Sequence, residues 1–116
     1  MISFNNSMYA QHDNQYMRIA KIIVDSAQLE NYKTALKEGT AAAVNKEPGV
    51  LMLYAVYEKD NPTHVTVFEI YADKAAYELH IQTPHFKKYK SSVEHMVKSL
   101  ELIDVVPIAL EAKEKL

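Results

Sequence analysis

The sequence predicts an α+β fold in which a four-stranded antiparallel sheet carries helices on one face. Three observations support this prediction: strand-like and helix-like segments follow in the order βαββαβ, a short polar turn joins the two middle strands, and a capping residue precedes each helical segment. This order is that of the ferredoxin-like fold. The 116 residues suffice for one such domain. We place it at residues 17–107, with a flexible N-terminal arm at 1–16 and a charged tail at 108–116.

The first strand and the first helix are predicted from the segment that follows the arm. The run MRIAKIIV at residues 17–24 is rich in Ile and Val, which favour strands. Asp25 and Ser26 are both good N-cap residues, so a helix should begin there and end at Pro48-Gly49. Its apolar residues recur at helical spacing: Leu29, Tyr32, Leu36 and Ala43.

Two strands joined by a tight turn are predicted for the middle of the chain. The runs VLMLYAVYEK at residues 50–59 and HVTVFEIYA at residues 64–72 are rich in β-branched and aromatic residues. They flank Asp60-Asn61-Pro62, whose turn chemistry favours an antiparallel hairpin. These runs would supply the second and third strands of the sheet.

The second helical region is predicted as two helices with a break at Thr83-Pro84. Asp73 is a cap for the run KAAYELHI at residues 74–81, and Thr83 is a cap for the next helix, with Pro84 at its favoured first position. The apolar stripe of that next helix is Phe86, Tyr89, Val93, Met96 or Val97, and Leu100. The run LELIDVVPI at residues 100–108 would form the last strand.

The second strand indicates that both faces of the sheet are buried. Successive side chains of a strand point to opposite faces, and a face in water should carry polar residues. Here one set is Val50, Met52, Tyr54 and Val56, and the other is Leu51, Leu53, Ala55 and Tyr57. The helices can cover only one set, so we expect a homodimer in which two sheets pack face to face. The alternative is a monomer whose long tail folds over the sheet.

Composition and charge argue against several classes of partner. The formal net charge of −2 gives no long-range attraction to phosphate backbones, so we expect no nucleic-acid partner. No apolar run approaches the roughly 18 residues of a membrane span, and the first 16 residues lack the pattern of a signal peptide. We therefore expect a cytoplasmic protein, or an exported one if the arm is the remnant of a processed signal. The absence of cysteine excludes disulfides and thiolate metal sites.

Several short motifs lie between residues 47 and 89. Glu47-Pro48-Gly49 precedes the second strand, Glu69 and Tyr71 end the third, and the runs AAYELH and TPHF follow. In these motifs the chain resembles the antibiotic biosynthesis monooxygenase domain family, and the resemblance covers residues 17–107. It implies a dimeric α/β barrel with a pocket between sheet and helices in each subunit. The wider family includes cofactor-independent quinol and polyketide monooxygenases, haem-degrading enzymes and an isomerase of a phosphorylated dione.

Two histidines are the candidate catalytic bases. His80 ends the first short helix and His85 begins the next, so the helix break can bring both to one rim of the pocket, where Glu69 would arrive on the third strand. Histidine is the side chain best suited to take a proton near neutral pH. Alternatively, His80 is only a favourable cation near a helix C-terminus, and His85 packs or faces solvent. We disfavour a metal held by these three residues, because the break replaces the i, i+4 pairing of a helix-borne metal pair.

An aromatic wall is the second part of the predicted site. Tyr71 would help Glu69 to orient the substrate. The candidate substrate-binding residues are Tyr71, Tyr77, Phe86, Tyr54 and Phe68. Each could instead belong to the core, as aromatic residues on strands and helices often do.

The sequence indicates no cofactor. Its two glycines, Gly39 and Gly49, form neither a phosphate-binding loop nor a dinucleotide fingerprint, so neither flavin nor nicotinamide is indicated. The chain has no Trp, the residue that the resemblance implies for the haem-degrading branch. Haem is therefore disfavoured as well.

Three functions remain open from the sequence. The leading one is a cofactor-independent monooxygenase that uses dioxygen to oxidise a small quinol, phenol or enolisable compound, with His80 or His85 as the base. The second is an isomerase of a small phosphorylated dione, for which the available cations are Arg18, Lys87, Lys88 and Lys90. The third is a dimer that binds a small apolar ligand without catalysis. In the dimer, we expect the last strand and the tail to reach the partner subunit.

Overall fold

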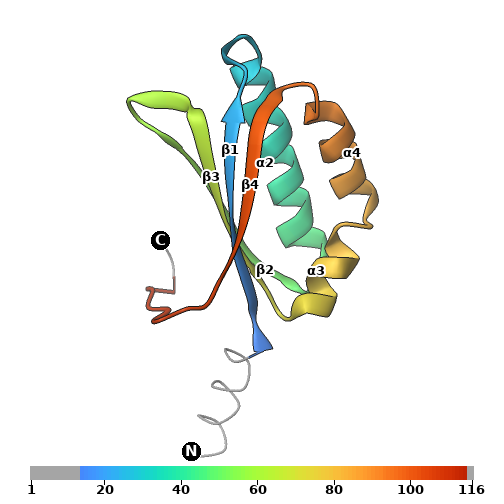
Figure 1. The fold of residues 1–116 in the computed structure, drawn as a ribbon. Helices are drawn as coiled ribbons and strands as arrows, with labels where there is room; N and C mark the ends of the chain where they lie inside the picture. The colour runs from blue at the N-terminus through green and yellow to red at the C-terminus, as the bar shows by residue number, and fades with distance from the viewer. Residues whose placement is uncertain (1–13, 115–116) are drawn as a thin grey trace, which may run out of the picture.

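The computed structural model describes residues 14–114. Its elements are β1 (Tyr16–Val24), the 3-10 helix η1 (Ser26–Gln28), α2 (Leu29–Lys46), β2 (Val50–Glu58), β3 (Asn61–Tyr71), α3 (Lys74–His80), α4 (Pro84–Val93) and β4 (Val97–Val105) (Figure 1). The predicted arm at residues 1–16 lies almost entirely outside the described residues. Residues 108–114, which belong to the predicted tail, form no helix or strand. Among the described helices, none is long and apolar enough to cross a membrane.

The four strands form one antiparallel sheet in the order β2-β3-β1-β4. Figure 1 shows α2, α3 and α4 together on one side of this sheet. The βαββαβ order and the single helical layer confirm the predicted ferredoxin-like α+β fold. The strands β1 and β3 are central, and β2 and β4 are the edges.

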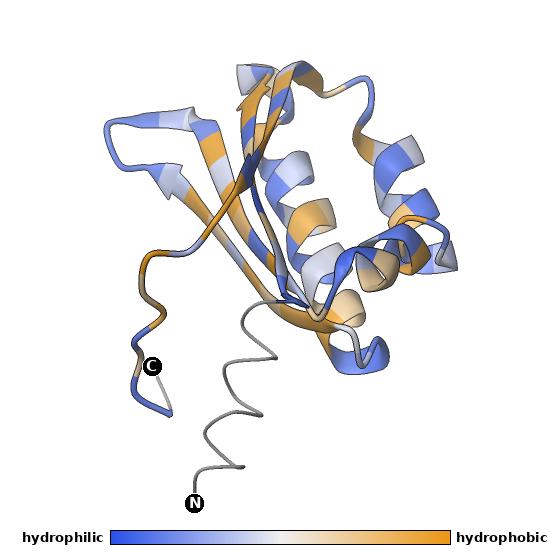
Figure 2. Ribbon diagram, turned by 60° about the horizontal axis from the view of Figure 1, so that its bottom comes forward, coloured by the Kyte–Doolittle hydropathy of each residue, from blue (hydrophilic) through white to orange (hydrophobic). Residues whose placement is uncertain are grey.

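The hydrophobic core lies between the sheet and the helices. Ala55, Val67, Ala20 and Leu102 form one row of paired residues across the four strands. Val67 and Ala20 are each only 5% exposed, so this row marks the inner face of the sheet. Figure 2 shows hydrophobic stretches along the strands and hydrophilic residues at the turn between β2 and β3.

The predicted break between α3 and α4 is confirmed by capping hydrogen bonds. Asp73 Oδ1 accepts a hydrogen bond from the Ala76 amide at 2.7 Å at the start of α3. Thr83 Oγ1 accepts one from the Phe86 amide at 3.2 Å at the start of α4, where Pro84 occupies the first turn. Local sequence signals therefore determine where each of these helices begins.

The hairpin differs from the prediction in its bounds. The strand β3 begins at Asn61 rather than at His64, so the turn is formed by Lys59 and Asp60. Pro62 is tolerated within β3 because the pairing of β3 with β1 begins only at His64. The sequence predicts Pro62 as a turn residue, but at this position it lies in β3 and interrupts no hydrogen bond between β3 and β1.

The boundary between α4 and β4 was also predicted wrongly. The apolar stripe predicted a helix that continues to Leu100, whereas α4 ends at Val93 and β4 begins at Val97. Pairing with β1 decides the outcome, because Val97 is the partner of Val24 in the ladder. Leu100 consequently lies in a strand, on the inner face of the sheet.

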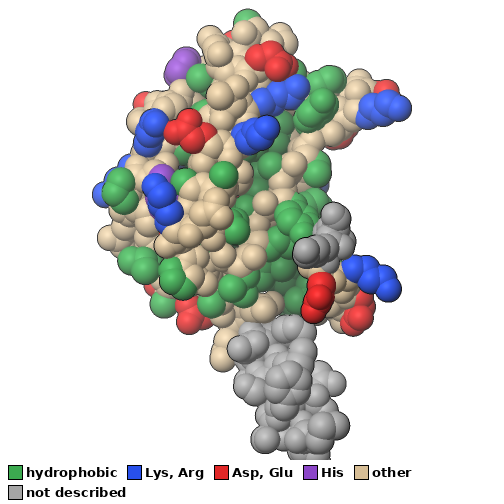
Figure 3. Space-filling view, turned by 180° about the vertical axis from the view of Figure 1, so that it is seen from behind, with side chains coloured by type: hydrophobic (Ala, Val, Ile, Leu, Met, Phe, Trp, Pro, Cys, Tyr) green, Lys and Arg blue, Asp and Glu red, His purple; other side chains and the backbone are tan. Residues whose placement is uncertain are grey.

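Part of the sheet face turned away from the helices is apolar. One row of paired residues on this outer face is Tyr54, Phe68, Ile19 and Ile103, and the next is Met52, Ile70, Met17 and Val105. Tyr54 is 48% exposed and Phe68 is 42% exposed. Figure 3 shows hydrophobic side chains gathered in the hollow between the β2–β3 hairpin and the C-terminal segment. We refer to these two rows as the outer face.

Candidate functional site

A cavity of about 170 Å³ opens between the inner face of the sheet and the helices. Its polar wall contains Arg18, Glu69, Tyr71, Tyr77 and His80. Most of the remaining wall is apolar and is formed by Ala20, Ile22, Leu36, Leu53, Val67, Phe86, Leu100 and Leu102. A hollow with apolar walls and a few convergent polar groups is typical of a small-molecule site.

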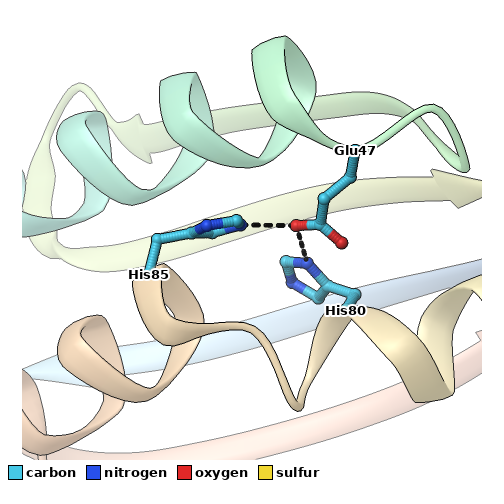
Figure 4. Close-up of side chains that lie close together, drawn as sticks. All are labelled: Glu47, His80 and His85. Atoms are coloured by element: carbon cyan, nitrogen blue, oxygen red, sulfur yellow. Dashed lines mark hydrogen bonds and ion pairs between the residues drawn. The ribbon is translucent and has the colours of Figure 1, made fainter.

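Glu47, His80 and His85 form a hydrogen-bonded group beside this cavity (Figure 4). Glu47 Oε2 lies 2.9 Å from His80 Nδ1 and 2.6 Å from His85 Nε2. The exposed fractions of the three side chains are 11% for Glu47, 8% for His80 and 16% for His85. We call this group the histidine–glutamate cluster. The two histidines do lie together, but the carboxylate that joins them is Glu47 and not Glu69.

Glu47 is positioned by the way in which α2 ends. A residue before proline is disfavoured in the helical conformation, and Glu47 is extended, with φ −110° and ψ 110°. Gly49 packs so close to α3 that an added Cβ would lie 2.6 Å from the Ala76 Cβ. The motif Glu47-Pro48-Gly49 therefore stops α2 and lets α3 approach β2. This close approach brings His80 to the Glu47 carboxylate.

The joint between α3 and α4 positions the imidazoles. His80 is the last residue of α3, and its carbonyl accepts hydrogen bonds from Thr83 Oγ1 at 2.7 Å and from the Thr83 amide at 3.1 Å. His85 follows Pro84 in the first turn of α4. Because Thr83 is bonded to the end of one helix and caps the next, it sets the relative position of both histidines.

These hydrogen bonds indicate which ring nitrogens carry protons. An ionised carboxylate only accepts hydrogen bonds. When Glu47 is ionised and both rings are neutral, His80 Nδ1 and His85 Nε2 therefore carry the hydrogens. His80 Nε2 is then unprotonated, and His80 is the member of the cluster that lines the cavity. The cluster can thus present a basic nitrogen to a bound molecule.

Glu69 and Tyr71 form a second polar pair in the cavity wall. The Tyr71 hydroxyl donates a hydrogen bond to Glu69 Oε1 at 2.7 Å. Burial raises the pKa of Glu69, although the hydrogen bond from Tyr71 and the charge of Arg18 oppose this shift. Burial also raises the pKa of the Tyr71 phenol, so the hydroxyl keeps its proton and remains a donor. Glu69 lies at the pocket, where the sequence placed it.

Three of the five aromatic residues predicted to contact the substrate line the cavity: Tyr71, Tyr77 and Phe86. The Phe86 ring lies edge-on to the His80 imidazole, with 5.0 Å between the ring centroids. The Tyr77 and Tyr71 rings are 5.3 Å apart in a similar edge-on arrangement. These rings surround the catalytic candidate with apolar surface and leave the Tyr71 hydroxyl facing Glu69.

The prediction that Tyr54 and Phe68 bind substrate is corrected by the sheet register. The two residues are partners across β2 and β3 on the outer face, and neither lines the cavity. Side chains alternate along a strand, so Phe68 points away from the face that carries Glu69. The sequence shows which residues alternate but not which of the two sets the helices cover.

Sequence reasoning noted the Glu47-Pro48-Gly49 motif but did not assign Glu47 to the site. A glutamate directly before a helix-ending proline was the available signal, and it did not reveal that the side chain is buried. The histidine–glutamate cluster also has the composition of a metal site: the atoms that could bind a metal ion, one from each residue, all lie within 4.8 Å of one another. Imidazole nitrogen and carboxylate oxygen are ligand types that zinc uses. In this structure, however, hydrogen bonds inside the cluster already pair these atoms.

Comparisons with known proteins agree on one family. The family model described as antibiotic biosynthesis monooxygenase matches residues 15–92. A solved structure of a proposed antibiotic biosynthesis monooxygenase from Bacteroides thetaiotaomicron is 52% identical, with a TM-score of 0.86, and the match covers 90% of this chain and 99% of that one. These two findings confirm the family resemblance that was drawn from the sequence motifs.

More distant structures share the fold. A proposed monooxygenase from Lactobacillus acidophilus is 34% identical, with a TM-score of 0.78, over 79% of this chain and 44% of that one. A proposed antibiotic biosynthesis monooxygenase from Nitrosomonas europaea is 19% identical, with a TM-score of 0.77, over 82% of this chain and 91% of that one. At that identity the likeness concerns the fold alone. No curated protein matches the chain at a significant level.

Proposed function

We propose that this chain, which belongs to the antibiotic biosynthesis monooxygenase family, is a cofactor-independent monooxygenase acting on a small quinol, phenol or enolisable compound. One observation carries the proposal. His80 lines a mostly apolar cavity while its Nδ1 is hydrogen-bonded to the buried carboxylate of Glu47. This arrangement suits a base that removes a proton from a substrate held in an apolar site.

The first step is the removal of a substrate proton by His80 Nε2. Glu47 accepts the hydrogen bond from Nδ1, which fixes the tautomer and stabilises the imidazolium that forms. His85 donates to the same Glu47 oxygen from the other side, at 2.6 Å, and so holds the carboxylate in place. His80 is therefore the base, Glu47 its positioning partner, and His85 a support for Glu47.

The second step is electron transfer from the substrate anion to dioxygen. A deprotonated quinol or enol is a far better electron donor than its neutral form, so the substrate itself supplies the electrons. A ring or former methylene carbon of the anion that carries negative charge and one hydrogen adds dioxygen, and the adduct takes up a proton to form a hydroperoxide. Loss of water from this hydroperoxide leaves a carbonyl at that carbon: one oxygen atom enters the product, and the other leaves in water. The apolar walls keep dioxygen and the anion together and exclude bulk water. Glu69 and Tyr71 orient the polar end of the substrate.

The apolar outer face supports the expected homodimer. Its two rows of paired residues contain only apolar or aromatic side chains, and a patch of this kind on a soluble protein usually marks an interface. A second copy of the chain would cover the patch by symmetric packing of two sheets. Light scattering should give twice the 13.2 kDa mass of one chain. Phe68→Lys should lower that mass towards a single chain.

An isomerase of a small phosphorylated dione is the second candidate. It is favoured by one observation, namely that Arg18 and Lys90 both line the cavity. The same base could move a proton between carbon atoms of a dione without consuming oxygen. Oxygen consumption therefore separates the two candidates, and its absence would also leave the third possibility, a dimer that binds a ligand without catalysis.

An oxygen electrode tests the proposed activity directly. Purified protein, treated with a chelator and supplied with no flavin, should consume dioxygen with at least one member of a panel of quinols and enolisable compounds. His80→Gln should reduce the rate by about 100-fold or more, the usual effect of losing a general base. Activity should rise as the pH is raised from acidic towards neutral values, because only a neutral imidazole can accept the substrate proton.

A second histidine provides the matched control. His64 lies on the hairpin, outside the cavity, with its side chain 40% exposed. His64→Gln should leave the rate unchanged. Full activity in His80→Gln, or loss of activity on chelation, would contradict a cofactor-independent mechanism with His80 as the base. The double change His80→Ala with His85→Ala should abolish activity without altering the mass of the assembly.

A further inference from the structure

We propose that Arg18 forms a subsite for a carboxylate group, so that the cavity takes a small aromatic or enolisable acid in preference to its neutral counterpart. The proposal deepens the proposed function and rests on it only in treating this cavity as the substrate site. Arg18 lies on β1 and lines the cavity together with His80 and Glu69. The sequence had suggested Arg18 only as one of several possible phosphate ligands.

Arg18 is buried without full compensation of its charge. Its side chain is only 10% exposed. The buried Nε atom has no hydrogen-bond partner among the described residues. A buried charge is costly unless it is paired and hydrogen-bonded, so an uncompensated guanidinium beside a cavity favours a ligand that brings negative charge.

Among the residues that the structure describes, the carboxylate nearest to Arg18 does not satisfy this need. Asp104 Oδ1 lies 3.6 Å from Arg18 Nε, which is too long for a hydrogen bond, and the Asp104 side chain is 67% exposed. The same oxygen already accepts a hydrogen bond from the Tyr16 hydroxyl at 2.9 Å. Water and Tyr16 therefore compete for Asp104, and its attraction to Arg18 is screened.

The second nearby carboxylate, Glu69, is held by another residue. Glu69 is the cross-strand partner of Arg18 in the β1–β3 ladder. Its Oε1 accepts the hydrogen bond from Tyr71 at 2.7 Å. Burial raises the pKa of Glu69 and so favours its neutral form. Glu69 thus leaves much of the positive charge of Arg18 available to a ligand.

Aromatic contacts hold the guanidinium in place. Arg18 Cζ lies 4.6 Å from the centroid of the Tyr77 ring and 5.6 Å from that of Tyr16. Both distances fall within the range of cation–π contacts. Because the group is already fixed by these rings, little side-chain entropy is lost when a ligand binds to it.

A carboxylate suits this subsite better than a phosphate. A guanidinium and a carboxylate are both planar and form parallel hydrogen bonds. A phosphate monoester is tetrahedral and carries close to two negative charges at neutral pH, whereas Arg18 offers one positive charge and a planar pair of donors. The cavity of about 170 Å³ also suits a single ring with one small substituent, since a cavity of roughly 150 Å³ holds benzene.

Calorimetric titration of the full chain with three matched probes tests the proposal. Benzoate and benzamide have the same ring and nearly the same shape but differ in charge, and phenyl phosphate carries the alternative anion. At pH 7 and low ionic strength, benzoate should bind about 10- to 100-fold more tightly than benzamide, the range for one charge-assisted hydrogen bond. Benzoate should also bind more tightly than phenyl phosphate. These measurements need no turnover, so they stand apart from the oxygenase test.

Two variants separate the role of Arg18 from that of the other cavity cation. Arg18→Gln should weaken benzoate binding by about 10- to 100-fold and leave benzamide binding unchanged, whereas Lys90→Gln should have little effect on either. Arg18→Lys, which keeps the charge but loses the planar fork, should weaken benzoate binding by a smaller factor.

Several results would overturn the proposal, and the first three need only the unmodified protein. These are equal affinity for benzoate and benzamide, no detectable binding of either, and tighter binding of phenyl phosphate than of benzoate. Loss of benzoate binding in Lys90→Gln but not in Arg18→Gln would move the subsite to α4. An equal loss of affinity for benzoate and for benzamide in Arg18→Gln would show that Arg18 only holds the Tyr77 ring in place.

Discussion

Two groups of charged side chains lie at the cavity, and they differ in how completely the protein satisfies them. In the histidine–glutamate cluster, one oxygen of Glu47 lies within hydrogen-bonding distance of both imidazoles. In the second group, which we call the arginine group (Arg18, Glu69 and Tyr71), Tyr71 donates to Glu69, and the Nε atom of Arg18 has no hydrogen-bond partner within residues 14–114.

The difference indicates that the two groups of side chains have separate roles. Polar groups that are hydrogen-bonded to one another inside a protein are held rigidly, which is what a base and its positioning partner require. A buried cation that remains unpaired beside a hollow is completed only when a ligand arrives. The comparison predicts that changes in the first group act on turnover, whereas loss of Arg18 from the second acts on ligand affinity.

Apart from the loss of the base itself in His80→Gln, the largest effect on turnover is expected from Glu47→Gln. The amide removes the negative charge that stabilises the His80 imidazolium and leaves the shape of the side chain almost unchanged. We expect kcat to fall by about 10- to 100-fold, the usual effect of losing a hydrogen-bonded support of an active-site imidazole, with little change in benzoate affinity. Steady-state oxygen consumption and calorimetry measure the two quantities separately. A large loss of affinity with unchanged kcat would reverse the assignment of the two groups.

A smaller effect on turnover is expected from His85→Asn. This change removes the donor at 2.6 Å from Glu47 Oε2 but retains the bond between Glu47 and His80. We expect kcat to fall by no more than about 10-fold, because His80 keeps its partner carboxylate. The pH profile should keep its shape, since His80 remains the base. A loss as great as that of His80→Gln would instead make His85 the base.

The smallest effect concerns stability and comes from Glu69→Gln. Burial raises the pKa of Glu69, so between its unfolded value of about 4.3 and its higher folded value the native state holds a proton that the unfolded state has lost. The free energy of unfolding therefore falls as the pH rises through this window. Glutamine does not titrate, so the free energy of unfolding of Glu69→Gln should not fall in this way. Relative to the wild type, the variant should therefore become more stable as the pH is raised from 4 to 7. The gain is about 1.4 kcal/mol for each unit of the pKa difference.

Urea denaturation at the two pH values measures this gain, and Glu38→Gln provides its control. Glu38 is exposed, and its hydrogen bond with Lys88 lowers its pKa, so this variant should show a small change of the opposite sign. The same gain in both variants would mean that the burial of Glu69 is not the cause.

The sequence by itself determined the elements of the fold and their order. Asp73, Thr83 and Pro84 marked helix starts, and the hydrogen bonds of both caps are present. Such signals depend on residues within about four positions of one another, so they can be recognised without knowledge of the tertiary structure. The motif Glu47-Pro48-Gly49 marked the end of α2 for the same reason.

Tertiary structure decided which residues meet and which face of the sheet they occupy. Glu47 is 33 positions from His80 and 38 from His85, and no local pattern links them. The assignment of Tyr54 and Phe68 to the outer face required knowing which set of alternating side chains the helices cover. The end of α4 required the β1–β4 register, because the stripe up to Leu100 fits a helix as well as a strand. A site built from side chains of several elements depends on distances between those elements, and packing alone sets these distances.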